Sequence, residues 1–242
     1  MSGERPGPRL SPGGQQFRGD DGSADAAVTT ALAGYATGAG SEHAALTALA
    51  AARLLVPVVS VLTEAGEHAD EHGGDKSSEM ALPTLIGNDG RPAIIAFTGL
   101  DALSRWRSDA RPIPAEAGRV WRAAVADGCA VVIDLAGPVP LAIEGARLAA
   151  LAQGQPVPYP HQDPDVLAEV EAVVAAHPAI TGARLAPGGA GLSAEPADLS
   201  VEFTVTADAG DWEQAVRRAA EQIATRLGRR LTRGIEISVA TR

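Results

Sequence analysis

Short apolar runs rich in β-branched residues alternate with stretches whose apolar residues recur every three or four positions. This alternation constrains the fold more than any other feature. The runs at 54–61 and 129–135 are almost entirely apolar, which is typical of strands buried on both faces. The stripes between such runs are typical of helices that cover a sheet. The sequence therefore predicts an α/β to α+β protein built from mixed sheets and helices.

The order of these segments predicts two small folded units. Residues 1–25 are polar, rich in glycine and proline, and without periodicity, so we expect a disordered tail there. A mixed sheet with helices is expected over 26–153, and the segment 154–162 is expected to be a linker. Residues 163–242 read as helix, strand, strand, helix, strand. That order suggests a ferredoxin-like α+β fold that lacks its first strand.

Capping and turn residues predict several element boundaries. Ser41 and Thr98 each precede an apolar stripe and are candidate helix N-caps. Asp163 is a further candidate N-cap, because Pro164 after it suits the first helical position. Asn-Asp-Gly at 88–90, between two apolar runs, predicts a hairpin. Gly128 is placed to end a helix in the left-handed conformation. Pro57 predicts that the strand in the first run lies at an edge or carries a bulge there, because proline has no N–H to donate.

Composition narrows the choice of partner and compartment. Thirty acidic residues against twenty basic ones give a formal net charge of −10. This argues against nucleic acid as the main partner, because phosphate binding needs a basic surface. No run of about 18 apolar residues and no secretory pattern is found, so neither a membrane span nor export is expected. The single cysteine fits a reducing, cytoplasmic setting.

Two further segments look like chemical motifs, and in both a structural role fits the residues better. His68 and His72 have the spacing of inverted zinc peptidases, but the segment 63–79 around them is acidic and glycine-rich and has no apolar stripe. We expect an exposed loop there and no metal. Lys76, the only lysine, lies in the same segment, so neither a P-loop nor a Schiff-base enzyme is expected, and no cofactor. Cys129 opens a buried strand and should act as a small apolar side chain.

Thr98 and Asp134 are the candidate ligand-binding residues. Each directly follows an apolar run that predicts a strand, and open α/β sheets often bind ligands at the carboxyl ends of their strands. The alternative is that Asp134 caps the turn before Gly137 and Pro138.

The last long helix and the turn after it hold a cluster of arginines. Two interpretations compete. The first is a solvated face that complements the negative end of the helix. The second is a docking patch for an acidic partner or for the chain's own segment 63–79. The cluster consists of Arg217, Arg218, Arg226, Arg229, Arg230 and Arg233.

Several of these segments together resemble the SseB N-terminal domain, found in proteins described as enhanced-serine-sensitivity proteins. They are Leu54-Leu55-Val56-Pro57-Val58, Leu82-Pro83, Asp89-Gly90, Ala96-Phe97-Thr98, Leu103 with Trp106, and Val132-Ile133-Asp134 before Gly137-Pro138. The resemblance covers about residues 28–153, and residues 163–240 resemble the second domain of such proteins. It implies a cytosolic, non-catalytic protein of actinobacterial type and carries over no catalytic residue.

These observations favour an interaction or regulatory protein without chemistry of its own. The alternative is a small-molecule sensor or enzyme with a pocket between the two units, near Thr98 and Asp134. The expected partner is a protein of unknown identity rather than nucleic acid or a membrane, and a homo-oligomer stays open.

Overall fold

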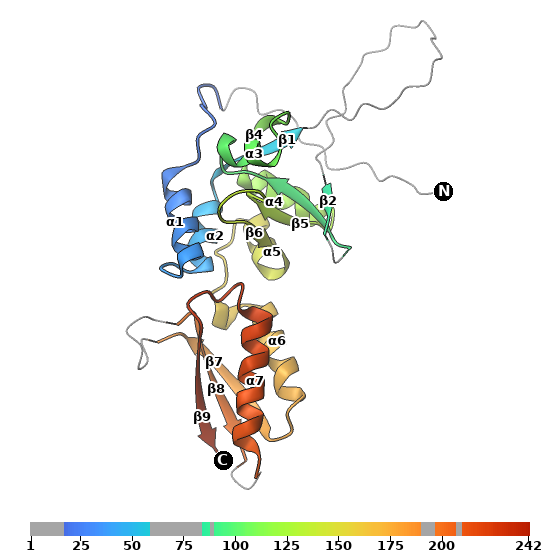
Figure 1. Ribbon diagram of the computed structural model, residues 1–242. Coiled ribbons are helices and arrows are strands. Elements are labelled where there is room, and N and C mark those ends of the chain that lie inside the picture. Colours follow the sequence, from blue (N-terminus) through green and yellow to red (C-terminus); the bar gives the residue numbers. More distant parts are fainter. Residues whose placement is uncertain (1–16, 59–83, 88–89, 190–196, 207–209) are drawn as a thin grey trace, which may run out of the picture. The chain divides into compact units, whose positions relative to one another are not determined.

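The chain divides into two units, each drawn from two stretches of sequence. The first unit joins Met1–Asp25 to Arg53–Ile143, and the second joins Ala26–Ala52 to Glu144–Arg242. Figure 1 labels the helices and strands of both. The predicted domain borders at 153 and 163 stay predictions. The computed structural model describes residues 17–58, 84–87, 90–189, 197–206 and 210–242.

The first unit contains two small sheets and two helices. In the two-stranded sheet, β1 (Arg53–Val58) pairs antiparallel with β4 (Arg111–Glu116). The second sheet has the strand order β2-β3-β5-β6, in which only β3 and β5 are parallel. Its strands are Thr84–Ile86, Pro92–Ala96, Ala130–Ile133 and Leu141–Ile143, and the helices are α3 (Leu100–Trp106) and α4 (Ala117–Ala126).

The apolar runs and stripes of the sequence make the core of this unit. The largest fully buried side chains include Trp121 of α4, Phe97 and Ile95. Gly128 has a φ of 65° and follows α4, as the sequence predicts. Pro57 stands opposite Pro112 in the two-stranded sheet, and Leu55 bonds to Phe97 on the other side of β1. The Pro57 nitrogen therefore points away from β4, and its missing N–H breaks no bond of that ladder.

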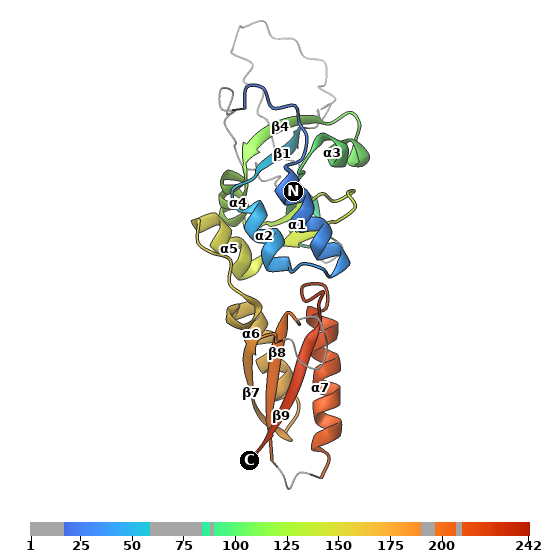
Figure 2. The same ribbon diagram turned by 90° about the vertical axis from the view of Figure 1, so that its left-hand side faces the viewer.

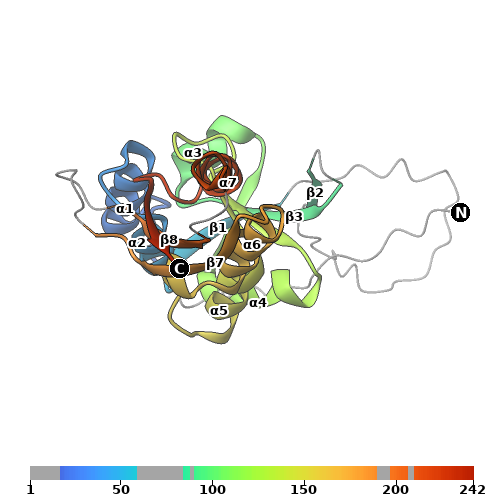
Figure 3. The same ribbon diagram turned by 90° about the horizontal axis from the view of Figure 1, so that it is seen from below.

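The second unit packs helices on a three-stranded sheet. Both α6 and α7 lie on one face of this sheet (Figure 2 and Figure 3). That face carries Val201, Phe203 and Val205, which alternate with half-exposed polar residues along β8. Its elements are α1 (Ala26–Thr37), α2 (Glu42–Leu49), α5 (Gly145–Gln153), a short 3-10 helix (Pro160–Gln162), α6 (Pro164–Ala175), β7 (Ile180–Pro187), β8 (Leu199–Val205), α7 (Trp212–Leu227) and β9 (Ile235–Thr241).

The order helix, strand, strand, helix, strand in 163–242 is confirmed, but the ferredoxin-like fold is not. The sheet has the order β7-β8-β9, with β7 antiparallel and β9 parallel to β8. In the split βαβ of a ferredoxin-like fold, another strand lies between the two parallel strands. Here those strands pair directly over seven residues, so no slot is left for the strand that the sequence lacks.

Three local features differ from the sequence-based expectation. Residues 17–25, expected to be part of a disordered tail, contact the first unit: Asp20 forms an ion pair with Arg53 at 2.8 Å. The sequence predicts no strand before the helix that follows Pro114, but β4 covers Arg111–Glu116. Thr98 does not cap α3; the N-cap is Gly99, and the Thr98 hydroxyl bonds to Asp134 instead.

Among the described residues, every helix is too short or too polar to cross a bilayer.

Candidate functional site

Thr98 and Asp134 lie together at the ends of two neighbouring parallel strands. Thr98 follows β3 and Asp134 follows β5. The Asp134 carboxylate accepts two hydrogen bonds from Thr98, one from the backbone N–H at 2.8 Å and one from the hydroxyl at 2.7 Å. The Thr98 carbonyl accepts a hydrogen bond from Arg53 at 3.0 Å. The sequence therefore identified a real pair of neighbours.

This pair is buried and satisfies its own hydrogen bonds. Asp134 is 4% and Thr98 7% exposed. Burial raises the pKa of the Asp134 carboxyl, and the hydrogen bonds from Thr98 oppose that rise. Asp134 also has a φ of 50° and its carbonyl accepts from the Gly137 N–H. The arrangement fixes the turn after β5, while a ligand-binding role for the pair stays a prediction.

The six arginines predicted as a patch divide into two groups. Arg230 and Arg233 turn inward: Arg230 binds Glu42 and Asp163, and Arg233 donates to Asp198 from both its backbone N–H and its Nε at 2.9 Å. Both side chains are largely covered and already ion-paired, so they contribute little free charge to a surface patch.

The other four arginines face solvent. Arg226 forms an exposed ion pair with Glu169 at 2.9 Å. Arg217 and Arg218 lie on the exposed side of α7, and Arg229 lies in the turn that follows it. The side chains of Arg217, Arg218 and Arg229 have no ion-pair partner among the described residues. These three are called the arginine face below, whereas Arg226 lies on the opposite side of α7 from Arg217 and is already paired with Glu169.

Of the two inward arginines, Arg230 belongs to a buried ion cluster that the sequence did not reveal. Glu42, at the start of α2, accepts from Arg147 of α5 and also from Arg230, while Arg230 binds Asp163 as well. Arg147 is 5% and Asp163 0% exposed. Burial raises the pKa of Glu42, and the two guanidinium groups oppose this. Asp163 was predicted only as the N-cap of α6, which is confirmed by its bond from the Asp165 N–H at 2.9 Å.

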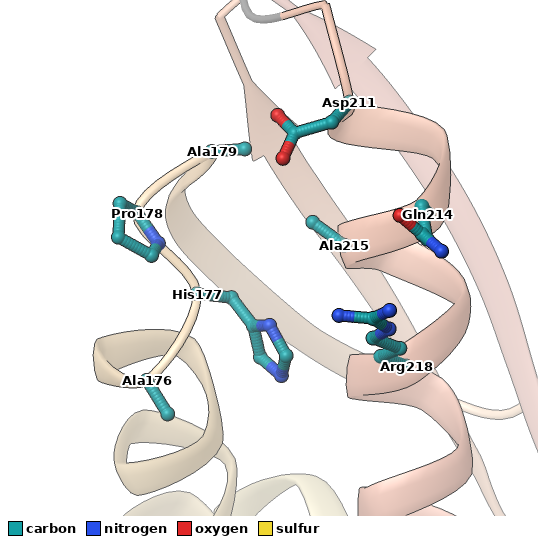
Figure 4. A pocket seen from close by; sticks show the side chains of 8 residues that line it. All are labelled: Ala176, His177, Pro178, Ala179, Asp211, Gln214, Ala215 and Arg218. Carbon is teal, nitrogen blue, oxygen red and sulfur yellow. The ribbon is translucent and has the colours of Figure 1, made fainter.

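A surface pocket of about 440 Å³ opens beside the first turns of α7 (Figure 4). The imidazole of His177 and the guanidinium of Arg218 point toward each other at one end, and the Asp211 carboxylate lies at the other. The His177 Nε2 is buried and has no hydrogen-bond partner in the described structure. Sequence reasoning missed His177, since it follows α6 in a short loop without any motif. The pocket is lined by Ala176, His177, Pro178, Ala179, Asp211, Gln214, Ala215 and Arg218.

Other candidate residues are either buried or outside the described residues. Cys129 is buried, as predicted, and burial raises the pKa of its thiol, which disfavours the reactive thiolate. His68 and His72 lie outside the described residues, together with the rest of the segment 63–79. Within the described residues, no group of three or more metal-ligating side chains is arranged to hold an ion.

A family model matches most of the first unit, together with helices α1 and α2. The model of the SseB protein N-terminal domain matches residues 28–150. No curated protein and no solved structure matches the chain. The matched range contains Thr98, Asp134, Glu42 and Arg147 but ends before the arginine face. The predicted likeness of residues 163–240 to a second domain stays a prediction. By its match over residues 28–150, the chain belongs to the SseB protein N-terminal domain family.

Proposed function

We propose that this chain is a non-catalytic interaction module and that the arginine face of α7 is its docking surface for an acidic protein segment. The observation that carries the proposal is the exposure of Arg217, Arg218 and Arg229 without ion-pair partners in the described structure. An exposed guanidinium can form a bidentate pair with a carboxylate, which gives direction as well as charge attraction.

The chain is acidic overall, so a group of exposed arginines on its surface points to an acidic partner. The formal net charge is −10, so an acidic partner would be repelled by most of the surface and attracted mainly where arginines gather. Such complementarity acts chiefly on association rate and orientation. We therefore expect binding that weakens as salt rises, because exposed charges are screened over about 10 Å at 0.1 M salt and about 3 Å at 1 M.

Charge reversal on the arginine face should weaken the binding of a fluorescein-labelled polyglutamate probe. We expect Arg217→Glu and Arg229→Glu each to raise the dissociation constant at low salt by about tenfold, which corresponds to about 1.4 kcal/mol. Fluorescence anisotropy at low and high salt measures this. Arg122→Glu is the matched control, since Arg122 is also an exposed helical arginine but lies on α4. Equal losses for Arg122→Glu, or binding that ignores salt, would contradict the proposal.

A second function, small-molecule binding, is favoured by the pocket beside α7. Two nitrogen-bearing side chains, His177 and Arg218, converge there. Guanidinium and imidazole together suit a carboxylate or phosphate group. The walls of Ala179, Ala215 and Pro178 are small and apolar, so the ligand class would be a small organic anion.

A thermal-shift screen of small carboxylates and phosphates tests this second function. A ligand that binds only the folded chain raises its melting temperature, by the equivalent of about 2.7 kcal/mol at a hundred times its dissociation constant. We expect the shift to disappear in His177→Ala and to persist in His161→Ala, a histidine outside the pocket. A hit that is lost only in Asp134→Ala would instead support ligand binding at Thr98 and Asp134. If no compound shifts the wild-type protein, the second function is wrong.

A further inference from the structure

The outer edge of β9 is unpaired over its full length within the described structure. β9 pairs with β8 alone, and it forms one margin of the sheet (Figure 1). The Gly234 carbonyl accepts from Asp198, and the Arg242 N–H donates to Val205. Even-numbered residues therefore direct their backbone groups toward β8. The N–H and C=O groups of Ile235, Ile237, Val239 and Thr241 must point away from it.

The two edges of this sheet differ in how they are protected. The opposite edge, β7, ends in Pro187 and has a register irregularity between Ile180 and Gly182. Proline and bulges are devices that keep edge strands from pairing with other chains. β9 has neither: its register with β8 is unbroken from Ile235 to Thr241 and it contains no proline. Its edge is thus regular and able to continue the sheet.

We propose that a second copy of this chain pairs with β9, antiparallel about a two-fold axis at Val239. In that register the outward-pointing residues form hydrogen-bonded pairs: Val239 meets its own counterpart, and Ile237 meets Thr241. A two-fold axis through an antiparallel strand pair is the symmetric, closed form of such an interface. The result is one six-stranded sheet, three strands from each copy.

Charge complementarity favours the register centred on Val239 and a second copy of the chain as the partner. With Val239 on the axis, Glu236 of each copy stands opposite Arg242 of the other, so two opposite-charge pairs flank the centre. Directly opposed charges of unlike sign stabilise a strand pair by about 0.2–1 kcal/mol each. A neighbouring register, centred on Ser238, would also pair the outward-pointing backbone groups. It would place Glu236 opposite Ala240, so neither Glu236 nor Arg242 would have a charge directly opposite. Val239, which is 39% exposed in the single chain, becomes covered by its counterpart.

The proposal is tested on the full chain by sedimentation velocity over a range of concentrations. An interface of one strand pair is small, so we expect a weak dimer with a dissociation constant on the order of micromolar. Glu236→Arg and Arg242→Glu should each weaken the dimer, because each places like charges opposite one another. The double variant Glu236→Arg with Arg242→Glu should restore it. A monomer at all concentrations, or a double variant no better than the single ones, would overturn the proposal.

Three further variants distinguish a dimer joined through β9 from a dimer joined through another surface. Val239→Pro removes an N–H that points away from β8, at an edge position where strands tolerate proline, so it should abolish the dimer while far-UV circular dichroism stays unchanged. Glu171→Arg makes the same charge change on the exposed side of α6 and should leave the dimer intact. Arg217→Glu should also leave it intact, since the arginine face is a different surface. A dimer lost in Arg217→Glu but not in Val239→Pro would mean that the arginine face, not β9, joins the copies.

Discussion

Replacing Arg230 by methionine should destabilise the second unit by about 3–5 kcal/mol, the usual loss when one member of a buried ion pair is removed. Arg230 binds both Glu42 and Asp163, and Asp163 is fully buried. Methionine fills much of the space but leaves two carboxylates with one fewer cation in a largely buried region. Arg147 then remains to compensate Glu42, while Asp163 loses its only ion-pair partner among the described residues.

Urea unfolding followed by fluorescence of Trp212, the tryptophan of the second unit, measures this loss. To isolate that signal, Trp106 and Trp121 of the first unit are replaced by phenylalanine in both proteins compared. Arg226→Met is the matched control, because the pair of Arg226 with Glu169 is exposed and such pairs contribute about 0–1 kcal/mol. If Arg230→Met and Arg226→Met cost the same, the cluster does not hold the unit together.

The buried ion cluster links residues inside the family match to residues beyond its end. The family match covers Glu42 and Arg147, whereas Arg230 and Asp163 lie beyond its end. Glu42 is therefore held by one arginine from within the matched range and one from outside it. Two of the four residues in the buried ion cluster lie outside the range of the family model. We therefore expect the stability of α2 to depend on residues after 150.

The sequence could predict those elements whose signal is local. The alternation along 199–205 comes from one apolar and one polar face of β8, and Asp163 followed by Pro164 marks the start of α6 through its own side chain and fixed φ. Gly128 ends α4 because its φ is positive. In each case a residue acts on its immediate neighbours, so the local sequence is enough to predict the element.

The features that sequence reasoning missed depend on partners far along the chain. Arg230 looks like any solvated arginine near a helix end, and its inward direction follows only from Glu42, which lies 188 positions earlier. β4 reads as a loop because of its prolines, but Pro112 lies opposite Pro57. Leu55 directs its N–H and C=O groups to Phe97, away from β4, so the nitrogen of Pro57, two residues on, also points away from β4. Pro112 forms the same non-hydrogen-bonded pair from the other side, so neither missing N–H interrupts the ladder.

Replacing Asp134 by alanine should destabilise the first unit by about 2–4 kcal/mol, because it leaves a buried N–H and a buried hydroxyl of Thr98 without acceptors, at about 1–3 kcal/mol for each unsatisfied group. Asp134→Asn is the informative companion. Its amide oxygen can still accept from the Thr98 N–H, and its NH₂ group can donate to the Thr98 hydroxyl oxygen. We expect this variant to lose much less stability at neutral pH than the alanine variant.

The pH dependence separates the two roles of the Asp134 carboxyl. Its pKa is raised in the folded chain, with burial as the main cause, so the folded state binds the proton more tightly than the unfolded state does. The resulting stabilisation is fully present below the unfolded pKa of about 3.9 and is lost as pH rises through the raised folded value. The stability of the wild type relative to Asp134→Asn should therefore fall over the acidic range above about pH 4 and then level off. Urea unfolding of both proteins at a series of pH values measures this difference. A difference that instead grows as pH rises would mean that the hydrogen bonds from Thr98 to the ionised carboxylate outweigh its burial.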